Sequence, residues 1–194
     1  MERIAAFRFL LDLHREGIPP WREAPMIDFK GSPFWQNYLL GSDDPAGPVA
    51  AFAAHAEICG TYFSSLPESK SIHRYAPDKW SVKQLLGHVT DSNLIFTYRL
   101  VSIARGETKP LPGFDEKVFA ANAAFDSTAW RDLLGNYRAV SQATAGFIAG
   151  FDAAAWNRQG CANDTRITPL EMLRVLMGHE RHHIRILKER YGLG

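Results

Sequence analysis

The sequence predicts an all-α protein, most simply a four-helix bundle, and three observations support this. Apolar residues recur at helical spacing in the long segments 81–105 and 168–191. Both segments open on a capping box, a serine or threonine followed three residues later by glutamine or glutamate. No convincing stretch alternates apolar and polar residues with the period of a strand. Four long helices, preceded by a short N-terminal one, would pack around a shared core.

The N-terminal part, residues 1–47, is expected to be an extension that packs on the bundle. Residues 2–16 have helical spacing, which ends at Gly17 before two prolines. Segment 17–48 is rich in proline and glycine but also carries several large aromatic residues. Because aromatic rings of this size are usually buried, the segment is predicted to wrap over the main body.

Residues 48–194 form the predicted bundle domain. Its helices are expected, in chain order, at residues 49–66, 81–105, about 127–150 and 168–191, with a short turn at 153–157. The first helix is alanine-rich and lies between two prolines. Asp126 or Ser127 is expected to cap the third helix, and Asp152 the short turn. Segment 106–126 is too long for a tight helix connection and is expected to cross an end of the bundle.

A His-Glu-x-x-His motif lies in the last predicted helix, at residues 179–183. His179 and His183 are one helical turn apart, so their side chains point the same way. They also follow an apolar stripe, which favours an inward position. Two such imidazoles can bind one metal ion, and Glu180 is a candidate base or a brace for an imidazole. A catalytic site usually needs a third protein ligand.

His88, in the third turn of helix 81–105, is the best candidate for that ligand. It lies at the border of the apolar stripe, where a cleft could reach it. His55 and Cys59 form a possible metal pair at i, i+4, but buried structural roles are favoured for both. His182 points off the face of the motif histidines. The two remaining histidines are predicted to be solvated or capping residues, His14 and His73.

The composition of the chain argues against several classes of protein. The chain has 194 residues and a formal net charge of +1, which gives no basis for binding nucleic acid or an anionic membrane. There is no apolar run long enough for a membrane span and no apolar core of a signal peptide at the N-terminus. Two cysteines are too few for a disulfide scaffold. A cytoplasmic protein is therefore expected.

Two motifs together resemble the DinB-like superfamily. The first is Trp80-Ser81-Val82-x-x-Leu85-Leu86-x-His88, and the second is His179-Glu180-x-x-His183 about ninety residues later. The resemblance covers roughly residues 48–192. It implies an up-down-down-up bundle with a long crossover between the second and third helices, and segment 106–126 fits that crossover. It also implies a divalent ion held by His88, His179 and His183 with water in an open position, and a homodimer.

The resemblance implies a metal-dependent hydrolase or a transferase that uses a low-molecular-weight thiol, acting on a small-molecule substrate. Known branches include bacillithiol S-transferases, mycothiol-dependent isomerases and the iron-binding part of ergothioneine-type synthases. Zinc, nickel and iron all suit three imidazoles. A zincin-type peptidase is disfavoured, because too few residues follow His183 to supply its usual downstream ligand. The remaining alternative is a non-catalytic metal-binding or small-molecule-binding bundle of the stress-response type.

Overall fold

The computed structural model describes residues 24–25 and 46–194, so the expected helix at 2–16 lies outside the described residues. Two short 3-10 turns, η2 and η3, accompany the helices, and one small sheet is present in the described part. The elements are α3 (Pro48–Ser65), η2 (Glu68–Lys70), α4 (Val82–Ala104), α5 (Glu116–Asn122), η3 (Phe125–Ser127), α6 (Trp130–Ile148), α7 (Ala153–Asn157), β1 (Gly160–Ala162), β2 (Thr165–Ile167) and α8 (Pro169–Glu189).

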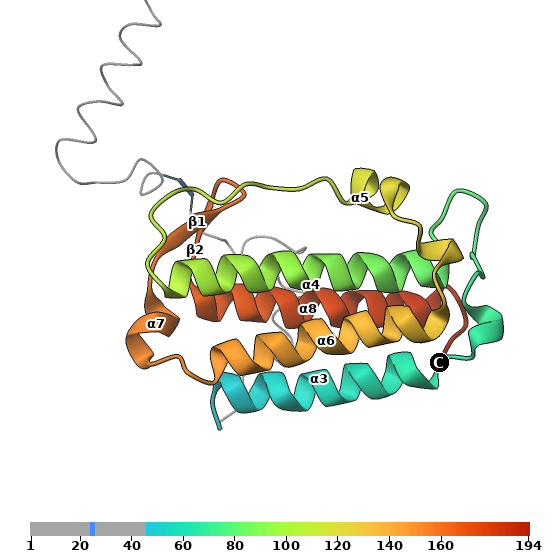
Figure 1. Ribbon diagram of the computed structural model, residues 1–194, viewed down its shortest axis with the longest axis horizontal. Helices are drawn as coiled ribbons and strands as arrows, with labels where there is room; N and C mark the ends of the chain where they lie inside the picture. The colour runs from blue at the N-terminus through green and yellow to red at the C-terminus, as the bar shows by residue number, and fades with distance from the viewer. Residues whose placement is uncertain (1–23, 26–45) are drawn as a thin grey trace, which may run out of the picture.

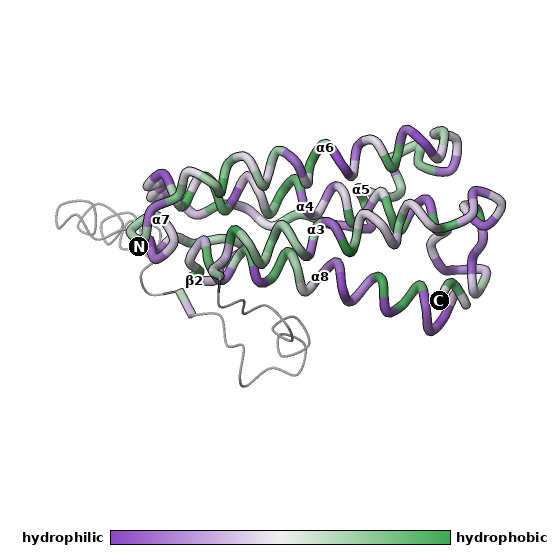
Figure 2. The backbone as a smooth tube through the Cα atoms, turned by 90° about the horizontal axis from the view of Figure 1, so that it is seen from below, coloured by the Kyte–Doolittle hydropathy of each residue, from purple (hydrophilic) through white to green (hydrophobic). Residues whose placement is uncertain are grey.

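The four long helices form the expected bundle. Helix α4 packs against α6 and α8, and α3 packs against the same two helices, so α3 and α4 lie at opposite corners. The chain runs one way along α3 and α8 and the other way along α4 and α6, which confirms the up-down-down-up order (Figure 1). Apolar and polar segments alternate along each long helix (Figure 2), as expected when one face is buried.

The helix starts follow their capping residues. Ser81 and Thr168 each form a complete capping box, and Pro169 occupies the first turn of α8. Asp152 caps α7, as predicted. The predicted cap of the third helix is wrong, because α6 begins only at Trp130.

Tertiary contacts explain that later start. Asp126 lies in η3, where its carboxylate accepts hydrogen bonds from the Ser81 hydroxyl and the Arg74 guanidinium. Its oxygens are therefore used to hold η3 against the start of α4. The carboxylate joins two segments distant in sequence, and the backbone N–H groups of α6 receive no side-chain cap.

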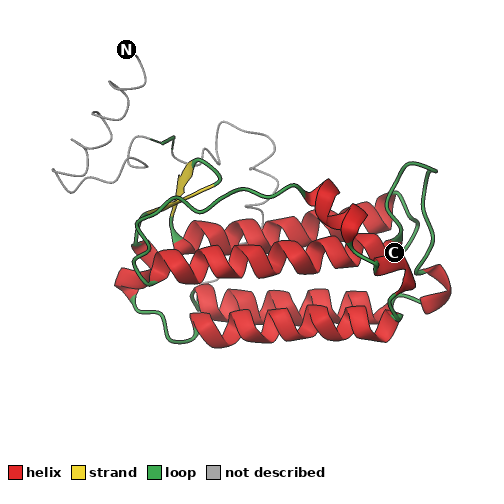
Figure 3. Ribbon diagram, turned by 45° about the horizontal axis from the view of Figure 1, so that its top comes forward, coloured by secondary structure: helices red, strands yellow, loops and turns green. Residues whose placement is uncertain are grey.

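The crossover between α4 and α6 lies along the outer side of α4 and carries the short helix α5 (Figure 3). It is tied down at Leu111, which forms a parallel bridge with Ala162. The hairpin β1–β2 that supplies this bridge was not predicted from the sequence. Its two-residue turn, Asn163-Asp164, has positive φ at both positions, which suits a tight hairpin.

The N-terminal extension is described at only a few positions. The Pro25 carbonyl accepts a hydrogen bond from the backbone N–H of Arg166, at 2.8 Å, so this point of the extension lies against β2. In the part of the chain that the structure describes, no helix is both long and apolar enough to cross a lipid bilayer.

Candidate metal centre

Three histidines from two neighbouring helices meet between α4 and α8. His88 lies in the second turn of α4, and His179 and His183 lie one turn apart on α8. The Trp80 ring packs on His88 with its centroid at 4.7 Å, and the Phe96 ring contacts His179 edge-on at 5.6 Å. These aromatic contacts, together with helix packing, fix the directions of the imidazoles.

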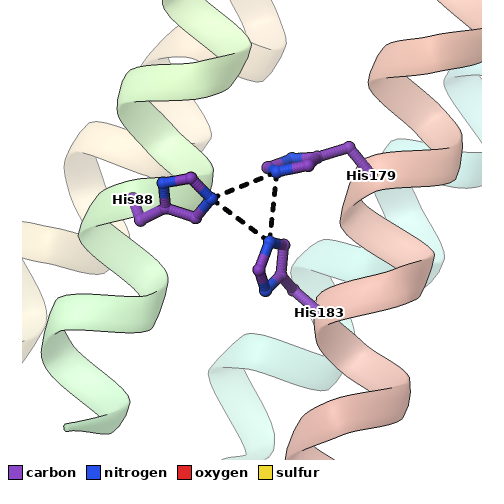
Figure 4. A group of neighbouring side chains, drawn as sticks. All are labelled: His88, His179 and His183. Atoms are coloured by element: carbon purple, nitrogen blue, oxygen red, sulfur yellow. Dashed lines mark hydrogen bonds between the residues drawn. The ribbon is translucent and has the colours of Figure 1, made fainter. Parts of the chain in front are cut away.

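The three Nε2 atoms form a nearly equilateral triangle, with edges of 3.1 Å (His88 to His179), 3.2 Å (His88 to His183) and 3.1 Å (His179 to His183). Figure 4 shows all three rings pointing at one another's tips. In a tetrahedral zinc site with bonds of about 2.0–2.1 Å, neighbouring nitrogens are about 3.3–3.4 Å apart, which is the bond length times about 1.63. The three residues therefore fit a single transition-metal ion.

The electrostatic environment keeps these imidazoles neutral. Burial lowers the pKa of His88 to about 4, against a small opposite effect of Glu116. Burial lowers the pKa of His179 and His183 well below the ordinary value, and the neighbouring imidazoles lower it further. Since a metal binds the deprotonated ring nitrogen, the site needs no proton release near neutral pH before it can bind an ion.

The histidine triangle lies on the wall of a cavity of about 460 Å³. The cavity lies between α4, α8, the crossover and the hairpin, and its lining is largely apolar and aromatic. Five polar residues on its wall were not predicted from the sequence: Ser92, Arg99, Glu116, Asn163 and Thr165. His182, whose ring contacts that of His183, also lines it. A pocket of this size and lining is typical of small-molecule sites.

Glu180 lies outside the cavity, in the core of the bundle. One carboxylate oxygen pairs with His55 Nε2 of α3, and the other accepts a 2.5 Å hydrogen bond from Asn93 of α4. Glu180 is 1% exposed and does not line the cavity. The expected roles of base or brace at the histidine triangle gain no support, because the next residue on a helix points about 100° away from its neighbour.

His55, Cys59 and Glu180 form a second cluster with three metal-ligand types in reach of one another. Burial and the charge of Glu180 raise the pKa of the Cys59 thiol, so the sulfur stays protonated in the metal-free protein. Both oxygens of Glu180 are already used. The cluster is therefore a buried hydrogen-bonded network that joins α3, α4 and α8, as favoured from sequence for His55 and Cys59.

Metal-free protein is expected to lose stability as the pH falls from about 6.5 to about 4. An unfolded histidine takes up a proton near its ordinary pKa of 6.5, whereas folded His88 does so only near 4. Its contribution to stability is complete above pH 6.5 and decreases by about 1.4 kcal/mol for each pH unit below it. Urea unfolding of chelator-treated protein at several pH values measures the slope, which should be shallower for His88→Gln. An equal slope in that variant would contradict the assignment.

The fold and the three inward histidines define a four-helix bundle with a candidate centre for a divalent transition metal. A family model of the DinB superfamily matches residues 51–187, so the chain belongs to the DinB superfamily. No curated protein matches the chain.

A solved structure supports the fold. It is YfiT from Bacillus subtilis, described as a probable metal-dependent hydrolase with an unusual four-helix bundle topology. The match has a TM-score of 0.65 and 18% sequence identity, and it covers 78% of this chain and 91% of YfiT. At this identity the likeness establishes a shared bundle topology.

Proposed function

We propose that this protein is a divalent-metal-dependent enzyme that hydrolyses a small molecule or transfers a low-molecular-weight thiol to it. One observation carries the proposal: three neutral imidazoles, two buried and one half-buried, converge on one point in the wall of a cavity of about 460 Å³. His88, His179 and His183 would hold the ion. The description of YfiT as a probable metal-dependent hydrolase agrees with this proposal.

A bound ion of this kind lowers the pKa of a coordinated water or thiol and so supplies a nucleophile near neutral pH. The protein's own residues would provide the rest. The Ser92 side chain lies in the cavity wall, one turn from His88, and its buried hydroxyl has no hydrogen-bond partner among the described residues. The apolar wall excludes water, which strengthens polar contacts within the cavity.

Glu116 is a better candidate for the base than Glu180. Among the described residues, it is the one acidic side chain that lines the cavity, and its charge acts on His88. It lies at the start of α5, on the crossover, and is exposed, so its side chain is able to move toward a bound substrate. A positioned general base typically contributes about 10²–10⁴-fold in rate.

The test compares metal-loaded and chelator-treated protein with p-nitrophenyl esters, and with chlorodinitrobenzene plus a small thiol. We expect activity that is lost on metal removal and restored on reloading. Glu116→Gln should lower the rate by about 10²-fold or more, whereas Glu180→Gln should leave it nearly unchanged. A rate that survives full metal removal would refute the metal-dependent mechanism.

The non-catalytic alternative predicts a closed coordination shell. Cobalt-loaded protein distinguishes the two, because an open position lets an added thiol such as 2-mercaptoethanol bind the ion and change the visible spectrum. A spectrum that stays constant at saturating thiol would favour a metal-binding module. The zinc, nickel or iron content of purified protein would identify the native ion. The homodimer expected from the family resemblance stays a prediction.

A further inference from the structure

Arg99 is a buried cation in the wall of the same cavity. Arg99 is only 5% exposed. One guanidinium nitrogen donates a 2.5 Å hydrogen bond to the Pro112 carbonyl, and the guanidinium lies 5.9 Å from the centre of the Phe114 ring. Among the described residues Arg99 forms no ion pair. Burial lowers its pKa, although the group stays charged.

A buried charge without a counter-charge is costly, so such charges are normally paired or bind a ligand. The carbonyl of Pro112 accepts one hydrogen bond, whereas a guanidinium has five N–H donors. The remaining donors belong to a side chain that lines the cavity. An anion entering the cavity would therefore meet a cation that has no negative partner among residues 24–25 and 46–194.

Arg99 lies at a distance from the histidine triangle. Residues 88, 92, 96 and 99 share one face of α4, and all four line the cavity. His88 and Arg99 are 11 residues apart, which is about 16 Å of helix at 1.5 Å per residue. Between them, the wall is formed by Phe96 and Ser92, and the buried Ser92 hydroxyl has no hydrogen-bond partner in the part of the chain that the structure describes. The cavity thus has a metal-binding end and a cationic end, separated by a mostly apolar wall.

The charge balance favours a single negative charge on the ligand. Apart from the histidines, which are neutral here, the charged residues that line the cavity in the described part of the chain are Arg99 and Glu116, and Glu116 acts on His88 at the other end. A phosphate monoester carries about −1.5 to −2 charges, which the single positive charge of Arg99 would not balance. A carboxylate carries one charge and matches the planar fork of a guanidinium.

We propose that Arg99 anchors the carboxylate of an elongated, largely apolar monocarboxylate, whose other end lies at the histidine triangle. The anchor proposal rests on the proposed function and assigns a substrate class to that function. Arg99 is then a specificity-determining residue. Its bond to Pro112 also couples the anchor to the crossover that carries Glu116.

Direct binding tests this without turnover. Octanoate, octan-1-ol and octylammonium are titrated calorimetrically into metal-free and zinc-loaded protein. We expect metal-free wild type to bind octanoate about tenfold or more tightly than octan-1-ol, and octylammonium more weakly than either, because a charge-assisted bidentate contact forms only with the carboxylate. Equal binding of octanoate and octan-1-ol to metal-free wild type would overturn the proposal, and this comparison needs no variant.

Variants then assign the preference to Arg99. In Arg99→Met the preference for octanoate should fall to about threefold or less, with octan-1-ol binding unchanged. Arg105→Met, an exposed arginine directly after the end of α4, is the matched control and should retain the wild-type preference. Arg99→Lys keeps the charge and serves if Arg99→Met does not fold. An octanoate preference that survives in Arg99→Met and disappears on metal removal would place the carboxylate on the ion. That result would overturn the Arg99 anchor and leave the proposed metal-dependent function standing. If the octanoate preference depends on Arg99 but enzyme activity does not depend on the metal, only the proposed metal-dependent function is refuted.

Discussion

Replacing His179 by alanine is expected to remove the metal ion from the purified protein. Wild type should retain about one equivalent of a transition metal after extensive dialysis, because three imidazoles hold it. Removing only an outer partner of a metal ligand typically costs about 10–100-fold in affinity, so losing a ligand should weaken binding by at least about 100-fold. Elemental analysis of the dialysed proteins measures this directly.

His182→Ala is the matched control for that experiment. His182 is close to the triangle, on the same turn of α8 as His179, but its ring stacks on the edge of His183 and is not part of the triangle. This variant should keep about one equivalent of metal. His179→Ala that retains about one equivalent, or His182→Ala that loses it, would mean that the ion is not held by the three Nε2 atoms. Circular dichroism should show that both variants keep their helices.

Two of the three candidate ligands were predictable from local geometry alone. The i, i+4 spacing of His179 and His183 places them on one face of a helix whatever the rest of the chain does. His88 needed one further assumption, that α4 packs beside α8, which the family resemblance supplied. Glu180 shows the limit of motif reasoning. A residue directly after a ligand points to another face, and here that face packs on α3.

Residues that depend on tertiary contacts were missed. Ser92 and Arg99 follow His88 at i+4 and i+11, so the helical face they share was visible in the sequence, but its exposure to a cavity was not. Glu116 reaches the site only through the path of the crossover. The hairpin was missed because three-residue strands are too short to show a period, although Asn163-Asp164 is a typical turn pair.

Replacing Glu180 by alanine is expected to destabilise the protein by about 2–6 kcal/mol, because each of two buried donors left without an acceptor costs about 1–3 kcal/mol. The substitution leaves two buried donors, on His55 and Asn93, without their acceptor and opens a cavity in the core. Urea unfolding of chelator-treated protein measures the change. Glu189→Ala, an exposed glutamate near the end of the same helix, should change stability by less than about 0.5 kcal/mol.

The double variant His55→Leu with Glu180→Met separates the pair from the single residues. The comparison is with the single variants His55→Leu and Glu180→Met. If the two side chains stabilise the fold mainly through each other, the loss of unfolding free energy in the double variant should be smaller than the sum of the two single losses, because both buried polar partners are replaced by apolar groups. Additive losses would show that Glu180 acts through Asn93 or through its volume instead.

Glu180→Ala should still bind about one equivalent of metal, since the carboxylate of Glu180 contacts α3 and α4 and none of the three candidate ligands. Metal loss in a folded Glu180→Ala protein would return Glu180 to the metal site.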